Sequence, residues 1–569
     1  MLFKIVTLHL EKPRNMQESN NISEINIDNQ KIIDNKELNI WEALTPVVIL
    51  MGLLAYNIFY KDGAWLGDYS NQFILLIGGL VAAIVGFLNK VSIQRMVSEV
   101  WENWKSVFIP IMILFLVGAL AGTWLVSGII PAMVYYGLQV LSPAIFLPAS
   151  VIIAAIISIA TGSSWTTSAT VGIALVGIGS ALGIPSGMIA GAVISGAYFG
   201  DKMSPLSDTT NLAPAMAGTD LFTHIKYMAY TTVPTIIITL IVFTVLSGTI
   251  DTTGNAANTS FILETIDKYF KISPWLFVVP LVVIGMILLK TKPLVALGSG
   301  VVLAGIFALV FQPKLINSLT ESSTKTIITS VFTDTSIPID NSEYIAQLTE
   351  EDIVNINKDS KLKNLFTDND LEGVFSKEKL TSFFSSETYT QDVINSKVES
   401  VEKLITIKQL KKLFSAGGMN GMLWTIFLIV CAMVFGGIMD AIGALAKITN
   451  ALLSIATSIF GLFTSTVVSC LGLNAIASDQ YLAIVIPGKM FKKAFEDKNL
   501  APENLSRTLE DSGTVTSVLI PWNTCGAYQS GVLGVGVGEY FMYAVFNYLS
   551  PFMTLLFAAL RIKIREITK

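Results

Sequence analysis

Long stretches of mostly apolar residues recur along this chain of 569 residues. A helix needs about 20 such residues to cross a bilayer. Only 14% of the residues are charged, against roughly a quarter in soluble proteins. The fold class is therefore an all-α polytopic membrane protein, with about 10–12 transmembrane segments. The predicted spans are 43–60, 72–88, 107–126, 143–160, 227–248, 273–289, 293–311, 421–439, 450–471 and 539–560.

Two regions, 129–220 and 472–537, interrupt the apolar pattern with Gly, Pro, Ser, Thr and single acids. Such sequences favour broken or re-entrant helices over continuous spans. A membrane tolerates non-helical backbone only where other protein or a polar cavity surrounds it. We therefore expect these two regions to form the interior of the membrane domain.

Basic residues in short loops mark the cytoplasmic side of a membrane protein. They gather near 90–105, 290–292 and 489–493 and in the C-terminal tail. Placing all of them in the cytoplasm puts both termini there and leaves the central polar stretch outside. The expected parts are a polar N-terminal tail (1–42), a membrane half (43–311) with a first repeat (about 105–220), an extracytoplasmic polar insert (312–418), a membrane half (419–560) with a second repeat, and a basic cytoplasmic tail (561–569).

The two membrane halves resemble each other weakly at a shift of 310–315 residues. The first copy would start from the cytoplasm and the second from outside, so the repeats are expected to be inverted. Inverted repeats with broken helices are typical of secondary transporters, whose substrate site lies between the repeats. The aligned residues are Gly122 with Gly437, Gly128 with Gly443, Ser163 with Asn474, Ser168 with Asp479, and Asp201 with Asp511.

Acidic residues inside membrane segments are costly, so each is a functional hypothesis. Carboxylate, hydroxyl and amide oxygens suit hard cations, and a carboxyl group removed from water holds a proton more readily. One carboxylate can then bind Na⁺ or H⁺, and this competition is sufficient for exchange. The predicted ion-binding residues are Asp201 and Asp208 with Ser204, Ser207, Thr209 and Asn211, and Asp479 and Asp511 with Asn474, Thr514 and Asn523; Na⁺ is assigned to the four aspartates.

Local structural roles are the alternative for these acids: Asp201 would pair with Lys202, and Asp208 would cap a helix. His224 is expected in a solvated cytoplasmic loop. The net charge of −5 gives no reason to expect nucleic acid as a partner. The chain lacks a P-loop, an H-E-x-x-H motif and the Tyr-Asp dipeptide of intramembrane aspartyl proteases. No enzymatic activity and no cofactor are predicted.

Several motifs resemble the NhaC-type sodium/proton antiporter family, with similarity over about 43–311 and 415–560. The resemblance implies a bacterial inner-membrane protein that exchanges internal Na⁺ for external H⁺ in sodium and pH homeostasis. Transport of Li⁺ or a small organic acid, and a homo-oligomeric state, remain open. Relatives that resemble malate/lactate exchangers make a Na⁺/H⁺-coupled organic acid exchanger the alternative. The motifs are Thr161–Trp165 (TGSSW), Gly196–Pro214 (GAYFGDKMSPLSDTTNLAP), Ala477–Leu482 (ASDQYL), Leu509–Thr514 (LEDSGT) and Ile520–Tyr528 (IPWNTCGAY).

Overall fold

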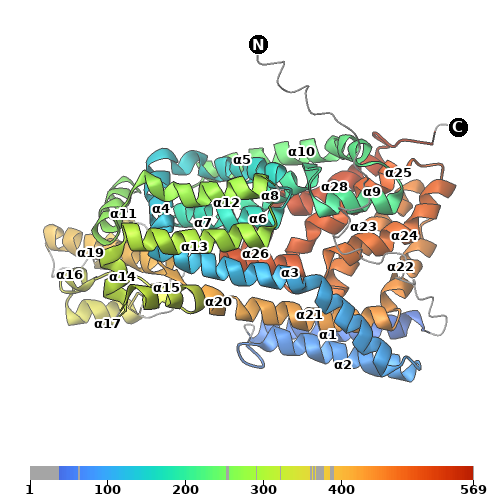
Figure 1. The fold of residues 1–569 in the computed structure, drawn as a ribbon, viewed down its shortest axis with the longest axis horizontal. Helices are drawn as coiled ribbons and strands as arrows, with labels where there is room; N and C mark the ends of the chain where they lie inside the picture. Colours follow the sequence, from blue (N-terminus) through green and yellow to red (C-terminus); the bar gives the residue numbers. More distant parts are fainter. Residues whose placement is uncertain are drawn as a thin grey trace, which may run out of the picture.

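The computed structural model describes residues 38–567, apart from 62–63, 251–254, 290, 321, 359–361, 363–364, 367–376 and 385–389. Most of the predicted N-terminal tail (1–42) and the last two residues of the basic tail therefore lie outside the described residues. The described chain is almost entirely helical (Figure 1), which confirms the all-α fold class. The one sheet within it pairs β1 (Thr335–Ser336) with β2 (Ser415–Ala416) in antiparallel register.

Eight helices in the described part are long and apolar enough to cross a membrane. Two bent helix pairs raise the number to ten if each pair is one span, with bends of 87° and 52°. The eight are α1 (Ile40–Lys61), α2 (Ser70–Leu88), α3 (Ile93–Val126), α5 (Pro143–Thr161), α10 (Leu221–Gly248), α13 (Pro293–Phe311), α21 (Leu423–Ala441) and α23 (Ile459–Ile476). The bent pairs are α11 (Asn255–Tyr269) with η2 (Pro274–Phe277) and α12 (Val278–Leu288), and α27 (Val537–Tyr540) with η5 (Phe541–Tyr543) and α28 (Val545–Ala559).

The predicted span over 450–471 starts too early, because the structure places the spanning helix at Ile459–Ile476. The chain turns within the predicted span, between α22 (Ala444–Ser454) and α23. The side chain of Ser458 caps α23 by accepting a hydrogen bond from the Gly461 amide at 2.9 Å. A hydropathy window averages over such a polar residue, whereas a hydroxyl that satisfies free amides starts a new helix.

Shorter and broken helices fill the interior between the long ones. Their residues are mostly buried, as expected for interrupted helices that other protein must shield. They are α4 (Ile129–Val140), α6 (Ser164–Thr167), the π-helical η1 (Ser168–Gly172), α7 (Ile173–Ala181), α8 (Ser186–Met203), α9 (Asp208–Ala217), α24 (Gln480–Asp497), α25 (Pro502–Leu509), the π-helical η3 (Glu510–Thr514), η4 (Ser517–Leu519) and α26 (Thr524–Leu533).

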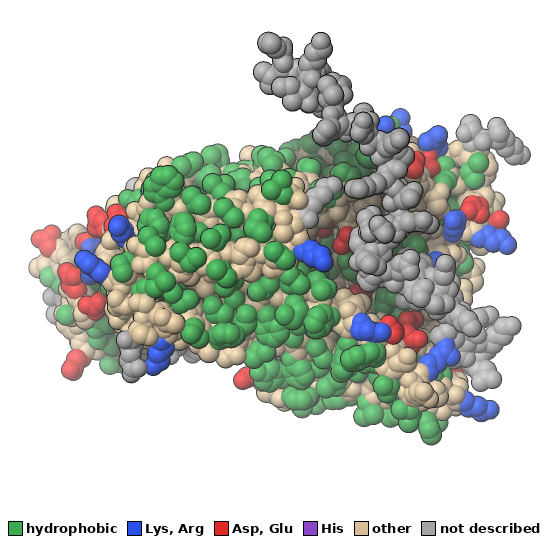
Figure 2. Space-filling view, viewed as in Figure 1, with side chains coloured by type: hydrophobic (Ala, Val, Ile, Leu, Met, Phe, Trp, Pro, Cys, Tyr) green, Lys and Arg blue, Asp and Glu red, His purple; other side chains and the backbone are tan. Residues whose placement is uncertain are grey.

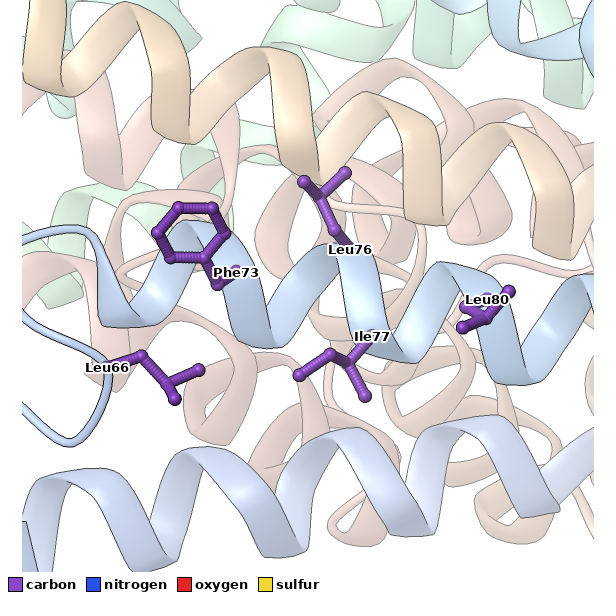
Figure 3. A pocket seen from close by; sticks show the side chains of 5 residues that line it. All are labelled: Leu66, Phe73, Leu76, Ile77 and Leu80. Carbon is purple, nitrogen blue, oxygen red and sulfur yellow. The ribbon is translucent and has the colours of Figure 1, made fainter.

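Hydrophobic side chains cover the broad middle of the molecule, and most charged side chains gather toward the two ends of its long axis (Figure 2). The long helices run along this axis (Figure 1), so the apolar belt has the form that a bilayer requires. An apolar cavity of about 520 Å³ opens on this belt (Figure 3). Its lining offers an ion no oxygen ligand from a side chain, and consists of Leu66, Phe73, Leu76, Ile77 and Leu80.

The insert is a folded helical cap at the end of the long axis opposite the C-terminus (Figure 1). It packs closely on α3, because a Cβ added to Gly122 would lie 1.8 Å from the Ser330 carbonyl oxygen. It also has a hydrophobic core of its own, which includes Ile356, Val398 and Val401. Its elements are α14 (Pro313–Leu319), α15 (Ser323–Phe332), α16 (Ser342–Ile345), α17 (Glu350–Lys358), α18 (Lys377–Phe384), α19 (Gln391–Leu413) and α20 (Gly418–Gly421).

One buried ion pair, between Asp352 of α17 and Lys397 of α19, joins the helices of the insert. Burial raises the pKa of Asp352, but hydrogen bonds from Lys397 and Thr349 outweigh burial and hold the pKa below its usual value. A lowered pKa in the folded state stabilises the insert above the pKa of the unfolded chain, near pH ~4. That contribution is lost as the pH falls through the folded pKa.

We expect the insert to keep its full protection from amide exchange down to about pH 4 and to lose it below. In the Lys397→Met variant, burial still raises the pKa of Asp352 but no ammonium group lowers it. The insert should therefore lose its protection from amide exchange at a higher pH. Hydrogen–deuterium exchange of α17 and α19 peptides between pH 3 and 6, corrected for the intrinsic pH dependence, measures this. Identical profiles for the two proteins would show that the pair does not stabilise the insert.

Candidate functional site

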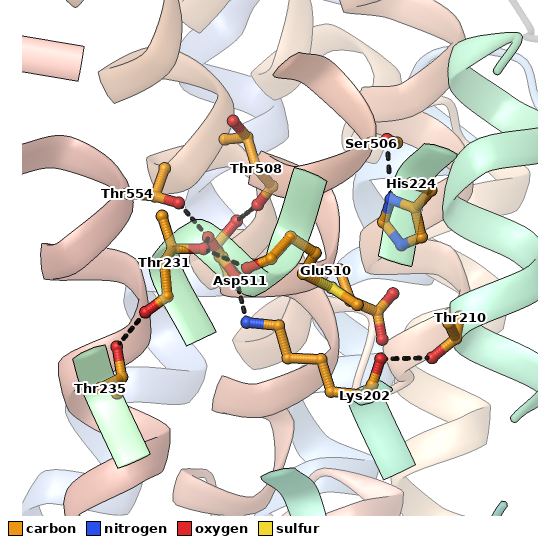
Figure 4. A network of polar contacts seen from close by, with 12 residues as sticks. Lys202, Thr210, His224, Thr231, Thr235, Ser506, Thr508, Glu510, Asp511 and Thr554 are labelled. Carbon is orange, nitrogen blue, oxygen red and sulfur yellow. Dashed lines mark hydrogen bonds and ion pairs between the residues drawn. The ribbon is translucent and has the colours of Figure 1, made fainter. Parts of the chain in front are cut away.

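A buried ion pair between Lys202 and Asp511 lies at the centre of the broken-helix region (Figure 4). Both side chains are 0% exposed. Asp511 Oδ2 also accepts hydrogen bonds from the hydroxyls of Thr231, at 2.8 Å, and Thr554. Four segments, α8, α10, η3 and α28, thus converge on one carboxylate. Because an unpaired buried charge is very costly, these contacts fix the carboxylate firmly.

Glu510, next to Asp511, is also fully buried. Its Oε1 atom accepts a hydrogen bond from Thr209 at 3.0 Å. Its Oε2 atom has no partner within the described chain. Buried polar atoms are nearly always paired, so an open carboxyl oxygen points to a bound ion, water or proton. Both acids lie in the π-helical turn η3, a form of helix that is frequent at functional sites.

Asp201 lies in the last turn of α8, and its carboxylate reaches the first residue of α6. It accepts hydrogen bonds from the amide and the hydroxyl of Ser164, at 3.1 and 2.6 Å. The local alternative, an ion pair between Asp201 and Lys202, is wrong because Lys202 binds Asp511. Asp201 and Asp511 therefore bind different partners: Asp201 accepts from Ser164, and Asp511 pairs with Lys202.

The linker between α8 and α9 holds the other residues predicted for the first cluster. Ser207 caps α9, so the alternative in which Asp208 is the cap is wrong. Asp208 begins α9 and its residue is exposed. Ser204 donates to a backbone carbonyl of α5 at 2.8 Å, and Asn211 donates to two carbonyls of the linker. Ser204 and Asn211 thus shape the break, while the Ser207 hydroxyl also bonds the Asp201 carboxyl group and Thr209 reaches Glu510.

In the second predicted cluster, too, some residues cap helices and only Asp511 takes part in the ion pair. Asp479 caps α24 by accepting from the first two amides beyond Gln480, at 2.7 and 3.0 Å, whereas Asp511 binds Lys202. Asn474 donates to a backbone carbonyl of η3 at 2.7 Å. Asn523 caps α26 and donates to the Asn474 carbonyl at 2.9 Å. The Thr514 hydroxyl is buried beside the Glu510 carboxyl group.

Helix caps and positive-φ residues recur in the two halves of the membrane domain. Most recurrences are 316 residues apart, which differs from the shift of 310–311 expected for this part of the chain. With the new register, Ser163 corresponds to Asp479, and Asp201 corresponds to Ser517 instead of Asp511. The inverted orientation of the two halves stays a prediction. The recurring pairs are Gly128 and Gly443 (315 apart), Ser142 and Ser458, Gly162 and Ser478, Ser163 and Asp479, Gly183 and Asn499, Ser207 and Asn523, and Gly218 and Gly534.

Sequence reasoning missed three partners of these acids. Thr231 and Thr554 lie in apolar spans; Thr231 starts a row of threonines spaced four residues apart in α10, a polar stripe that could have signalled an interior-facing side. Ser164 belongs to the TGSSW motif, and no pattern in the sequence predicts its contact with Asp201. The expectation for His224 is also wrong, because it is fully buried in α10 with Nδ1 2.8 Å from Ser506 Oγ.

An apolar helical bundle that shelters broken helices, a buried ion pair and an open carboxyl oxygen defines a multi-pass membrane transporter. The sequence profile described as the Na⁺/H⁺ antiporter family matches residues 196–345 and 392–562. The chain belongs to this family.

Three relatives show how far the similarity extends. The Na⁺/H⁺ antiporter NhaC of Alkalihalophilus pseudofirmus is 34% identical, over 86% of this chain and 90% of its own. The arginine/ornithine antiporter ArcD of Halobacterium salinarum is 32% identical, over 78% and 77%. The malate-2H⁺/Na⁺-lactate antiporter of Bacillus subtilis is 28% identical, over 92% and 94%. The resemblance to NhaC-type antiporters is confirmed.

Proposed function

We propose that this protein exchanges cytoplasmic Na⁺ for external H⁺, and that Asp511 is the carboxylate for which the cations compete. The observation that carries the proposal is the site around Asp511, fully buried and bound at once by an ammonium group and two hydroxyls. The family and the NhaC relative support exchange of these two ions. On this proposal the protein works in the bacterial inner membrane with both termini in the cytoplasm.

The ammonium group of Lys202 occupies the position on Asp511 that a transported cation needs. Na⁺ prefers oxygen ligands, and Asp511 with the hydroxyls of Thr231 and Thr554 supplies them. Na⁺ can enter when Lys202 gives up a proton, because the net charge of the buried site then stays constant. A site that keeps its charge avoids the penalty of a buried unpaired ion. Binding of Na⁺ is in this way coupled to release of H⁺.

Asp201 and Glu510 are proposed as a second carboxylate site, since both are buried and Glu510 has an open oxygen. The remaining predicted residues would keep the helix breaks in shape, with Asp479 and Asn523 as caps. The recurring caps support a repeat in the membrane domain. Movement of one repeat against the other would expose the site to each side in turn.

Na⁺/H⁺-coupled exchange of an organic acid is the second candidate, and the malate/lactate relative favours it. A substrate carboxylate would need a free cationic group in the site. Lys202 is buried there but is already bound to Asp511. Arg507, which is buried four residues before Asp511, has two guanidinium nitrogens without a hydrogen-bond partner in the described chain and is the candidate group for such a carboxylate. The family and the NhaC relative favour inorganic ion exchange as the first candidate.

Purified protein in liposomes with a trapped pH dye tests the proposal. We expect Na⁺ to dissipate an imposed pH gradient, and the apparent affinity for Na⁺ to fall as the pH falls, because protons compete for the site. K⁺ should be much weaker, and malate or lactate should not be required; Li⁺ is measured alongside. A response that needs malate or lactate would replace the proposal by the second candidate, and a pH-independent affinity for Na⁺ would refute the competition.

A further inference from the structure

The C-terminal strap, residues 561–567, crosses the start of α25. Leu500 and Glu566 form an isolated antiparallel bridge. The Ala501 amide donates to the Arg565 carbonyl at 2.9 Å, and the strap's last described amide donates to the Asn499 carbonyl at 3.0 Å. The strap is therefore attached by backbone hydrogen bonds to the loop between α24 and α25.

Tyr227 of α10 joins the strap to both neighbouring helices. Its hydroxyl shares one proton between Asn504 Oδ1 of α25, 2.7 Å away, and the carbonyl of Lys563. The same oxygen accepts the Arg565 amide at 3.1 Å. Asn504 in turn donates to the Arg565 carbonyl at 2.7 Å. Helix α10, helix α25 and the strap thus meet at one buried group.

Arg507 continues these contacts toward the ion site. Its buried guanidinium group lies over the Tyr227 ring, 4.7 Å from the ring centre, and donates to the Lys563 carbonyl at 3.4 Å. Arg507 precedes Asp511 by four residues, about one helical turn. Glu503, in the first turn of the same helix, pairs with Arg565 of the strap at 2.8 Å. The strap therefore binds the helix that leads directly into η3.

Asp511 and one of its three partners, Thr231, belong to the two helices that the strap connects. Thr231 belongs to α10, and Asp511 follows α25 directly. A separation of α10 from α25 would break the contacts of the strap with Tyr227, Asn504 and Arg507. The strap thus stabilises the closed arrangement through bonds that lie outside the ion site.

We propose that the C-terminal strap is a latch, which holds α10 against α25 and keeps the Lys202–Asp511 site closed toward the C-terminal end, with Tyr227 as its positioning residue. The proposal rests on the proposed function, because a latch matters only where a site opens. Its test measures access to the protein interior and needs no transport, so the two proposals can fail separately.

Labelling of a cysteine between α10 and α25, at the position of Ser506, tests the latch. Ser506 is fully buried in α25 and is replaced by cysteine in a chain whose three native cysteines are alanine. The purified protein in detergent is treated with N-ethylmaleimide, with the strap intact or with the chain ending at Arg561. Loss of several hydrogen bonds should raise the labelling rate about tenfold or more. An unchanged rate would overturn the proposal.

Two further variants separate a latch from general unfolding. Ser150→Cys places the probe at a fully buried position on α5, bonded within its own helix. Truncation should leave its labelling unchanged, and an equal rise at both positions would overturn the latch. Tyr227→Phe keeps the ring over Arg507 but removes the hydroxyl. In the full-length chain it should raise labelling at position 506 several-fold, and no rise would refute the role of Tyr227.

Discussion

Replacement of Asp511 by asparagine is expected to reduce Na⁺-driven proton movement by ~100-fold or more. The change leaves the ammonium group of Lys202 buried without its counter-charge, and breaking a buried ion pair in this way typically costs about 3–5 kcal/mol. It also removes the carboxylate from the proposed Na⁺ position, whose other ligands are the neutral hydroxyls of Thr231 and Thr554. The rate is measured with the trapped pH dye in liposomes.

A double variant separates folding from transport in this prediction. Lys202→Met combined with Asp511→Asn removes both charges, so thermal stability should recover toward the wild-type value while exchange stays lost. If the double variant exchanged Na⁺ for H⁺ at the wild-type rate, the pair would be structural only. Near-normal exchange in Asp511→Asn alone would refute the proposed site.

The second large effect is expected at Asp201, with Asp208 as its matched control from the same motif. Asp201 is buried and accepts two hydrogen bonds from Ser164, so Asp201→Asn should lower exchange by about 100-fold, through lost charge and misdirected amide donors. Asp208 is exposed at the start of α9, and Asp208→Asn should change the rate less than about threefold.

Exchange by both variants is measured in the same liposomes over a series of Na⁺ concentrations. Equal losses at the two positions would show that the burial of a carboxylate does not determine its importance for exchange. A loss at Asp208 alone would move the second ion site to the linker between α8 and α9.

The membrane-spanning helices were largely predictable, because the hydrocarbon core of a bilayer demands long apolar runs and the sequence displays them directly. Failures occurred where a local hydrogen bond decides the structure. The turn before Ser458 divides an apolar stretch in two, and the last predicted span, 539–560, is bent by 52° where η5 meets α28. Hydropathy measures transfer to lipid and carries no information on which hydroxyl caps a helix.

Asp201, Asp511 and Thr209 were predicted from sequence. The contacts of Asp511 with Lys202, Thr231 and Thr554, and of Asp201 with Ser164, were not predicted. Adjacent residues on a helix point in directions about 100° apart, so Asp201 and Lys202 were poor candidates for a pair. The actual partner of Lys202 is 309 residues away, a distance that only the tertiary fold can bridge. The shift between the repeats was misplaced for a related reason: the caps share a backbone conformation, while their residue types differ, as in Gly162 and Ser478.

The position of the strap has a practical consequence for protein production. The amide of Ile567, the last residue of the strap, binds the loop before α25. An affinity tag or fluorescent protein fused there would pull on the segment that closes over Tyr227. Fusions at the N-terminus, or a cleavable C-terminal linker, leave that segment in place and give the sounder starting material for transport assays.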